Sequence, residues 1–371
     1  MCRIGCIKSL DPFHPRFALN LMLPQQKGHD NSGFALVMKD LYGLFEPYKK
    51  YPLLSYSSTA KGREIIEAYM LDRGFGRPVF QWKPKTKTFN TSYDFEKMAF
   101  YGFEAYALPV ITQGTSEEEK GEFLLNTRLE LRELLESTGD GYIFSFWPDT
   151  LTLKEIGNPN HIGDYFNLWE ENEPILAKNI MVQYRQNTNY DIVRYAAHPF
   201  FLQGYTLCAN GENTNYVKNK EAQQNLHRGY IGFESDSQCF LYTLHYTHHQ
   251  LKWPLSYYKH VITPLPFDEM DSHPNKALLL KLRESLTHLE INGPNTIIGL
   301  LPDNTLFTTC DSKKLRPVVI GTDGRMVGIT SEVPGLNMIL PHRNAEADIY
   351  PNERETVVIG NDLRIERWKQ Q

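Results

Sequence analysis

The chain has 371 residues, of which 41% are hydrophobic and 22% are charged. This balance is typical of a globular protein with a sizeable core, and the length allows one enlarged domain or two. The net charge of -5 argues against nucleic acid or an anionic membrane as the main partner, and no apolar run is long enough to span a bilayer. The start lacks the apolar stretch of a secretion signal, and the five scattered cysteines suit a reducing compartment, so we expect a cytoplasmic protein.

The first forty residues alternate between strand and helix patterns. Residues 2–8 form a short apolar run that predicts a strand, and the apolar spacing in 15–23 predicts a helix. A polar turn follows at 27–33. It leads into the apolar run 34–38, which predicts a buried strand.

Residues 45–175 differ from the rest of the chain because they are rich in aromatic and charged side chains. They contain one clear helix pattern at 116–137, where Ser116 and Glu119 have the spacing of a capping box. We interpret 45–175 as an insertion or subdomain within one domain that covers residues 1–371. The helix should bury an apolar stripe made of Leu124, Leu131 and Leu135.

From residue 181 onward the pattern becomes rich in strands again. One helix is expected over 275–289, and short paired strands separated by turn residues indicate hairpins. Strand-rich ends around helices favour an α+β layered architecture. The expected helix stripe is Leu278, Leu282, Leu286 and Leu289, and the expected hairpins are 295–301 with 305–310, 316–321 with 325–330, and 355–359 with 363–368.

Cys2 is the first candidate for chemistry. Removal of Met1 would leave a free α-amine on this cysteine, and an α-amine has an ordinary pKa of about 7.7–8.0. Near neutral pH the amine could accept the thiol proton, and the resulting thiolate could attack a carboxamide. Cys6 lies within the predicted strand with no amine beside it, so we interpret it as a core residue. Taken alone, Cys2 is better explained as a small apolar strand residue.

Further residues suit the binding of a polar amide. The side-chain amide of Asn210 and the backbone N–H of Gly211 could direct two donors at one oxygen, which is what a tetrahedral oxyanion requires. Arg185, followed by Thr188, carries a fork that can bind a carboxylate through two hydrogen bonds. Asp236 could hold the α-ammonium of an amino acid. Each group by itself is more often a turn or a surface feature.

The order of these features along the chain resembles the class II glutamine amidotransferases. That family has Cys at the mature start, then Arg-Gly-x-Asp, Arg-x-x-Thr, Asn-Gly and Ser-Asp-Ser. The corresponding segments here are Cys2, 27–30, 185–188, 210–211 and 235–237. Five segments in one order make a specific signal.

Within that family, the sequence is most similar to the amidotransferase domain of glutamate synthase. Asn189 and Glu212 also match that domain, and later segments such as Thr322-Asp323-Gly324-Arg325 follow in the same order. The resemblance covers residues 2–40 and 180–360. It includes no motif within 45–175.

The resemblance implies a fold and a set of roles. The fold would be the four-layer αββα sandwich of the N-terminal-nucleophile hydrolases. Cys2 would be the nucleophile, with its own α-amine as base, and Asn210 with Gly211 would form the oxyanion hole. The remaining roles would be glutamine binding by Arg185, Thr188 and Asp236, and support of the site by Lys27 and Asp30.

Three positions depart from the family pattern. Lys27 replaces the Arg of Arg-Gly-x-Asp, which keeps the charge but loses the rigid fork. Gln186-Asn187 replaces Tyr-Ser after the substrate arginine, and Ala209 replaces the His before Asn-Gly. None of these changes removes a group that the chemistry requires.

The resemblance also implies a partner. A glutamate synthase needs flavin and iron–sulfur machinery, and this sequence has neither a cysteine cluster for an iron–sulfur centre nor room for a flavin barrel. We therefore expect no cofactor in this chain. Flavin and an iron–sulfur cluster would belong to a separate synthase subunit that receives ammonia derived from glutamine.

Two alternatives stay open. The same fold could serve a free-standing amidase acting on another amide, or a binding or regulatory protein that has lost catalysis. A metal site is not expected, because the helical spacing of His245, His248 and His249 lacks a further ligand motif and better suits polar packing.

Overall fold

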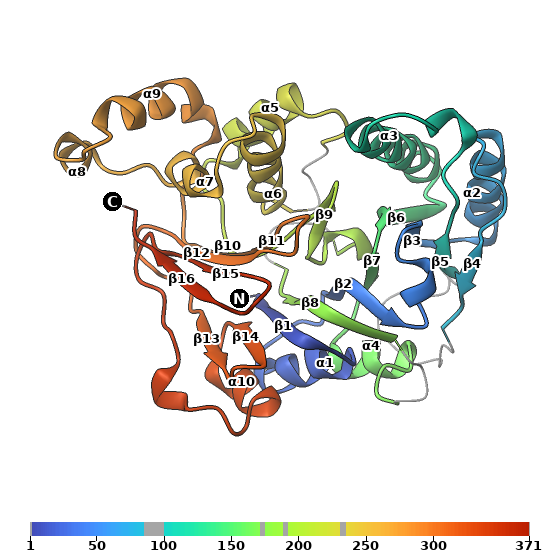
Figure 1. Ribbon diagram of the computed structural model, residues 1–371, viewed down its shortest axis with the longest axis horizontal. Helices are drawn as coiled ribbons and strands as arrows, with labels where there is room; N and C mark the ends of the chain where they lie inside the picture. Colours follow the sequence, from blue (N-terminus) through green and yellow to red (C-terminus); the bar gives the residue numbers. More distant parts are fainter. Residues whose placement is uncertain (1, 85–99, 171–174, 188–191, 231–234, 371) are drawn as a thin grey trace.

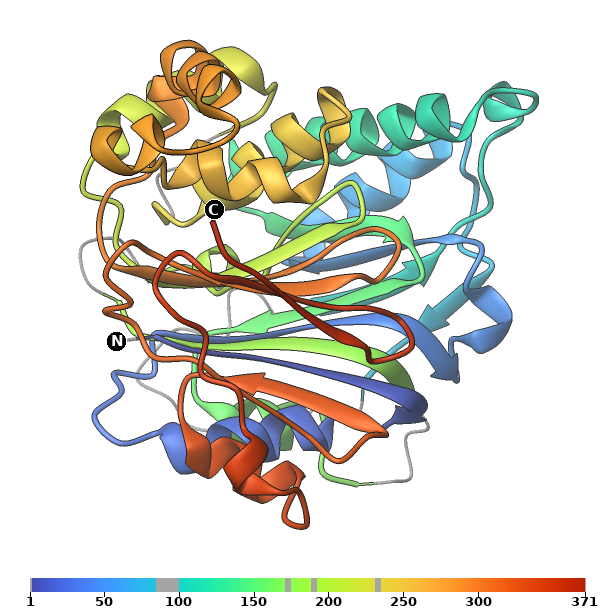
Figure 2. The same ribbon diagram turned by 60° about the vertical axis from the view of Figure 1, so that its left-hand side comes forward.

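The computed structural model describes residues 2–84, 100–170, 175–187, 192–230 and 235–370. In this part of the chain, two six-stranded antiparallel sheets lie face to face, with helices on the outer face of each (Figures 1 and 2). The predicted α+β class and its αββα layering are therefore confirmed. No helix among the described residues combines the length and apolar character needed to cross a membrane.

The first sheet has the strand order β13-β14-β1-β8-β2-β7, so the start of the chain lies near its centre. Its central strands are buried on both faces, which explains the nearly continuous apolar run of β2. The strand bounds are β1 Arg3–Phe13, β2 Gly33–Gly43, β7 Thr150–Glu155, β8 Ile175–Arg185, β13 Val319–Thr322 and β14 Met326–Thr330.

The second sheet has the order β16-β15-β12-β11-β10-β9 and packs on the inner face of the first. The core between the sheets joins Ile4, Cys6 and Met181 of the first sheet to Cys208 and Ile298 of the second. The strand bounds are β9 Phe200–Leu202, β10 Tyr205–Gly211, β11 Asn295–Leu300, β12 Leu306–Cys310, β15 Thr356–Ile359 and β16 Ile365–Trp368.

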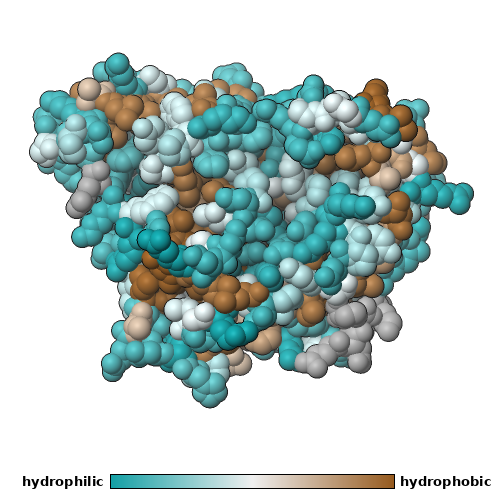
Figure 3. All heavy atoms as spheres, in the orientation of Figure 1, coloured by the Kyte–Doolittle hydropathy of each residue, from teal (hydrophilic) through white to brown (hydrophobic). Residues whose placement is uncertain are grey.

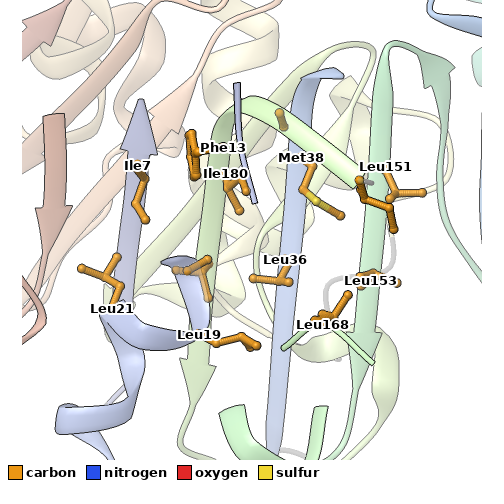
Figure 4. Close-up of a cluster of buried hydrophobic side chains, with 14 of the residues drawn as sticks. Ile7, Phe13, Leu19, Leu21, Leu36, Met38, Leu151, Leu153, Leu168 and Ile180 are labelled. Atoms are coloured by element: carbon orange, nitrogen blue, oxygen red, sulfur yellow. The ribbon is translucent and has the colours of Figure 1, made fainter. Parts of the chain in front are cut away.

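Helices α1 (Arg16–Met22), α4 (Pro159–Tyr165) and α10 (Val333–Ile339) cover the outer face of the first sheet. Figure 4 shows Leu19 and Leu21 of α1 among the side chains of the strands. The second sheet is covered by α5 (Tyr216–Leu226), α6 (Gln238–Leu244), α7 (Leu255–Ile262), α8 (Phe267–Asp271) and α9 (Lys276–Leu286). The face in Figure 3 is mainly hydrophilic, with apolar side chains in separate patches.

Much of the stretch 45–175 builds a third antiparallel sheet, with the order β4-β5-β3-β6. Its core packs against α2 and α3. The exceptions are β7, which pairs with β2 at the edge of the first sheet, and α4, which covers the outer face of that sheet. Whether 45–175 is an insertion stays a prediction. The bounds are β3 Pro52–Ser58, α2 Ala60–Asp72, β4 Phe80–Trp82, β5 Phe100–Ala105, α3 Glu117–Glu136 and β6 Gly141–Pro148.

Most of the predicted elements are confirmed. Ser116 and Glu119 form the expected capping box at α3, and the three expected hairpins pair as β11–β12, β13–β14 and β15–β16. The stripe of α9 is wrong at one position: Leu278 is 37% exposed, whereas Leu279 is buried. The predicted positions Leu282, Leu286 and Leu289 are buried, and Leu279 takes the place of Leu278 on the buried face, three residues before Leu282.

Candidate active site

Segments from both sheets meet at a small cavity of about 80 Å³. In the first sheet β1 begins directly after Cys2 and β8 ends at Arg185, while in the second sheet β10 ends at Gly211. The structure thus brings together five of the residues predicted from the sequence. Among the described residues, the lining is Cys2, Arg185, Gln186, Asn187, His198, Asn210, Gly211, Glu212, Ser235, Asp236, Ser237 and Arg316.

Cys2 is held beside Arg185 by strand register. Arg3 is paired with Tyr184 in the antiparallel β1–β8 ladder. Cys2, which precedes Arg3, therefore faces Arg185, which follows Tyr184. The backbone N–H of Gln186 donates to Cys2 Sγ at 3.4 Å. Burial raises the pKa of the Cys2 thiol, and the Gln186 hydrogen bond and the Arg185 charge oppose that shift.

The other four cysteines are buried, whereas Cys2 is partly exposed. Cys6, Cys208 and Cys310 lie in the core between the sheets, and burial raises the pKa of Cys6 to about 12. A thiol of this kind is inert at neutral pH, because the thiolate is the reactive form. Cys2 is therefore the thiol best placed to react with a molecule in the cavity.

Asn210 contributes an unused hydrogen-bond donor. Its side chain is 1% exposed, and its Nδ2 atom is buried with no hydrogen-bond partner among the described residues. A buried donor left without a partner costs about 1–3 kcal/mol, so a molecule that accepts from it would recover this free energy. The donor is therefore suited to a ligand oxygen.

Gly211 supplies a second donor next to Asn210. Gly211 is paired with Asn295 of β11 in the ladder. The backbone N–H of Asn295 donates to Asp311 Oδ2, on the side away from β10, so this is a pair without hydrogen bonds between its two residues. The N–H of Gly211 therefore points away from β11. A Cβ at Gly211 would lie 2.3 Å from the carbonyl oxygen of Pro294, which explains why glycine is required.

Groups of opposite charge lie on two sides of the cavity. Arg185 is 4% exposed and donates through Nη2 to Asn187 Oδ1 at 2.9 Å. Asp236 Oδ2 accepts from the backbone N–H of Asn213 at 2.7 Å. Burial lowers the pKa of Arg185 and raises the pKa of Asp236, so each charged form would gain from an oppositely charged ligand group.

The loop 27–33 is linked to the cavity indirectly, because Asp30 binds Asn187, which is one of the lining residues. Asp30 accepts from the backbone N–H groups of Ser32 and Asn187, both at 3.0 Å, which ties the loop to the end of β8. Lys27 is exposed and outside the cavity lining, so its supporting role stays a prediction. Thr188 lies outside the described residues, so its role also stays a prediction.

His198 is a cavity residue to which the sequence reasoning gave no role. Its Nδ1 accepts from the backbone N–H of Ala209 at 3.2 Å, so Nε2 carries the proton and donates to Ser235 Oγ at 3.0 Å. Burial lowers the pKa of His198 well below its ordinary value. The neutral ring therefore holds Ser235, the residue before Asp236, against β10 at Ala209, the residue before Asn210. In the sequence, the one indication that His198 belongs to the site was that it lies close to Asn210.

The histidines that the sequence assigned to polar packing lie away from this cavity. His245 Nε2 is 2.6 Å from Gln203 Oε1, and His248 Nδ1 is 2.8 Å from the Tyr205 hydroxyl. Within the described residues, no group of three or more His, Cys, Asp and Glu side chains is arranged to hold a metal ion.

Comparison with known proteins gives the following distant similarities. No protein-family model matches the chain. The sequence is 25% identical over 214 residues to an uncharacterized protein of Archaeoglobus fulgidus, and this match covers 57% of the chain and 55% of the relative. The chain therefore spans about half the length of the curated relative that it matches.

Solved structures with a similar arrangement include an allosteric regulatory enzyme of purine biosynthesis (TM-score 0.46, 12% identity) and glutamine phosphoribosylpyrophosphate amidotransferase from B. subtilis (TM-score 0.42, 11% identity). Each match covers 99% of this chain and 49% of the other. A glutamine aminotransferase class-II domain protein from Silicibacter pomeroyi has a TM-score of 0.31 at 9% identity, over 91% of this chain and 98% of its own. TM-scores below 0.5 leave the function to be argued from the residues of this chain.

Alkylation of the folded protein should modify Cys2 and leave the other four cysteines unmodified, because those are buried. Burial raises the Cys2 pKa, so the rate should keep increasing with pH beyond the ordinary thiol pKa of about 8.5. Peptide mapping by mass spectrometry after iodoacetamide treatment measures both effects. A Cys2→Ser variant is the control, and modification of Cys6 or Cys208 in folded protein would contradict the assignment.

Proposed function

We propose that this protein is a glutamine amidotransferase that hydrolyses glutamine to glutamate and ammonia through a thioester on Cys2. The buried, unpartnered Nδ2 of Asn210 in the cavity that contains Cys2 is the observation that carries this proposal. The order of motifs in the sequence supports the same function.

Arg185 and Asp236 are the proposed determinants of substrate binding. The Arg185 guanidinium would bind the α-carboxylate of glutamine, and the Asp236 carboxylate would bind its α-ammonium. Both groups line the cavity with Cys2. A free amino acid satisfies both charges, whereas a simple amide satisfies neither. Thr188 would complete this subsite.

The proposed chemistry begins with removal of Met1. The freed α-amine of Cys2 takes the thiol proton, and the thiolate attacks the side-chain carbonyl carbon of glutamine. Asn210 Nδ2 and the Gly211 N–H stabilise the negative charge on the carbonyl oxygen. The amine returns the proton to the leaving nitrogen, ammonia departs and a thioester remains. Water, deprotonated by the same amine, then attacks the thioester and releases glutamate and the thiol.

Processing and the nucleophile can be tested together. The active protein should have the mass of a chain that begins at Cys2, and Cys2→Ala should abolish glutamate release, because no other residue supplies both thiol and amine. Cys6→Ala is the matched control and should keep most of the activity. Intact-mass measurement and a glutaminase assay decide the matter, and full activity in a chain that retains Met1 would refute the α-amine mechanism.

Substitutions of Asn210 and of Arg185 should affect different kinetic parameters. Asn210→Ala should lower kcat by about a hundredfold to a thousandfold with little change in KM, because its donor acts on charge that develops in the transition state. Arg185→Ala should mainly raise KM for glutamine. Steady-state kinetics of both variants test these roles, and the reverse pattern would show that the two assignments are wrong.

We further propose that the ammonia is used by a partner, a flavin- and iron–sulfur-containing synthase of the glutamate synthase type. Ammonia released to water would be lost, so slow hydrolysis in the absence of the partner is an advantage. Docking would then favour the active arrangement of the site. The stretch 45–175, with its own sheet, is the proposed docking or lid surface.

The partner proposal predicts weak glutaminase activity for the isolated chain and an increase when the synthase subunit and its acceptor are present. The measurement is glutamate release with and without the purified partner, together with size-exclusion chromatography of the mixture. Full activity of the chain alone, with no stable complex, would favour a free-standing amidase.

A further inference from the structure

A second cavity, of about 260 Å³, lies on the far side of the second sheet and shares no lining residue with the Cys2 cavity. It is formed by α7, the turn between α8 and α9, the segment before β15, and the residues that follow β16. Nothing in the proposed glutamine chemistry uses it. Its chemistry can therefore be considered independently of the proposed function.

Two buried N–H donors have no partner at this cavity. The backbone N–H of Asn275 donates to His273 Nδ1 at 3.0 Å, so the proton of the neutral ring is on Nε2. His273 Nε2 and Arg354 Nε are both buried, and neither has a hydrogen-bond partner among the described residues. Both residues line the cavity. One buried acceptor at the cavity, Gln370 Oε1, also has no partner among the described residues, so donors outnumber acceptors there and a ligand with several acceptors is favoured.

Positive charge accompanies these donors. Lys259 is 4% exposed, and its Nζ donates to the carbonyl of Cys310 and to Thr263 Oγ1, which uses two of its three N–H groups. Burial lowers the pKa of Lys259 to about 8, so the side chain is still mostly charged at neutral pH. A bound anion would stabilise this charge.

Two acidic groups lie near the cations of the cavity: Glu269 pairs with Arg354, and the charge of Asp311 acts on Lys259. The Glu269 carboxylate accepts from Arg354 Nη1 at 2.9 and 3.1 Å, which leaves the Nε of the same guanidinium unused. Among the described residues, the cavity lining includes no Asp or Glu, and Lys369 adds a further positive charge. The cavity therefore combines positive charge with free donors.

One wall of the cavity is apolar. Leu278, Leu279 and Trp368 are among its lining residues. Leu278 is the position at which α9 departs from its predicted stripe, and its partial exposure is explained by its place at this cavity. The site can thus contact a small organic group as well as an anion.

We propose that this cavity binds a small organic phosphate monoester. The phosphate would accept from His273 Nε2, Arg354 Nε and Lys259, which come from three different elements and so suit an anion with oxygens in several directions. The organic group would pack on Leu278 and Trp368. A carboxylate can also accept three hydrogen bonds, but its acceptor sites lie in one plane, which suits donors from three different elements less well.

Isothermal titration calorimetry with phenyl phosphate and with inorganic phosphate, at constant ionic strength set with chloride, tests this proposal. Wild-type protein should bind phenyl phosphate saturably and more tightly than inorganic phosphate, because the ring adds apolar contact. His273→Phe and Lys259→Met should each weaken binding at least about tenfold, since each removes a hydrogen bond to a charged group. The exposed His342 is the matched control, and His342→Phe should bind like the wild type.

Several results would overturn the proposal. The first is that phenyl phosphate shows no saturable binding. The second is that titration of sodium chloride or acetate gives the same heats as titration of phenyl phosphate. The third is that His273→Phe binds phenyl phosphate with the affinity of the wild type. Should Lys259→Met fail to fold because Lys259 also binds Cys310, His273→Phe alone decides. Glutaminase activity is not part of the readout, so loss of the proposed function would leave this test intact.

Discussion

The packing of one sheet on the other is the constraint on which the cavity depends. Cys2 and Arg185 are carried by strands of the first sheet, whereas Asn210 and Gly211 are carried by β10 of the second. Apolar contacts such as those of Cys6 hold the sheets together, but hydrophobic burial has no direction and tolerates small sliding movements. The relative position of the strand ends must therefore be set by directional contacts.

Buried polar side chains between the sheets supply these contacts. Lys39 of β2 donates to the carbonyls of Gly204 and Leu301, both at 2.8 Å, at the ends of strands in the second sheet. Burial lowers the pKa of Lys39 to about 7, which shows how strongly this position disfavours charge. Nearest the cavity, Gln183 donates to the carbonyl of Ala209 at 3.2 Å. Since Ala209 precedes Asn210 and Gln183 lies two residues before Arg185, this bond sets one half of the site against the other.

Local signals in the sequence were enough to find most of the elements. The hairpin β13–β14 was predicted from a turn whose glycine, Gly324, has a φ of 86°, and α3 was predicted from its capping box. These features involve residues close together in the chain. By contrast, β7 pairs with β2, more than a hundred residues earlier, and no short pattern indicates such a pairing.

The site shows the same limit. Cys2, Arg185, Asn210 and Asp236 were found through the order of their motifs, and the structure shows that they share one cavity. Lys39 could not be identified as buried, because a lysine at the end of an apolar strand is more often solvated. His198 was missed for a related reason: its importance comes from contacts with Ala209 and Ser235 that only the folded chain creates.

The surroundings of Cys2 bear directly on which group could act as its base. Burial raises the thiol pKa, so the thiol must be activated by a nearby proton acceptor. Of the described residues that line the cavity, His198 is the one histidine, but both of its ring nitrogens are engaged, by Ala209 and Ser235, and its pKa is lowered. Asp236 is engaged by Asn213 and is reserved in our proposal for the substrate ammonium.

Glu212 also lines the cavity, but its side chain is half exposed and lies 3.9 Å from the Arg316 guanidinium, so it is directed at a positive charge of its own. The side chains of the cavity therefore offer poor bases for a buried thiol. An α-amine on Cys2 itself has a pKa near neutrality and is attached to the same residue as the thiol, so its distance from the sulfur does not depend on packing. This is why the proposed mechanism requires Cys2 to become the N-terminal residue.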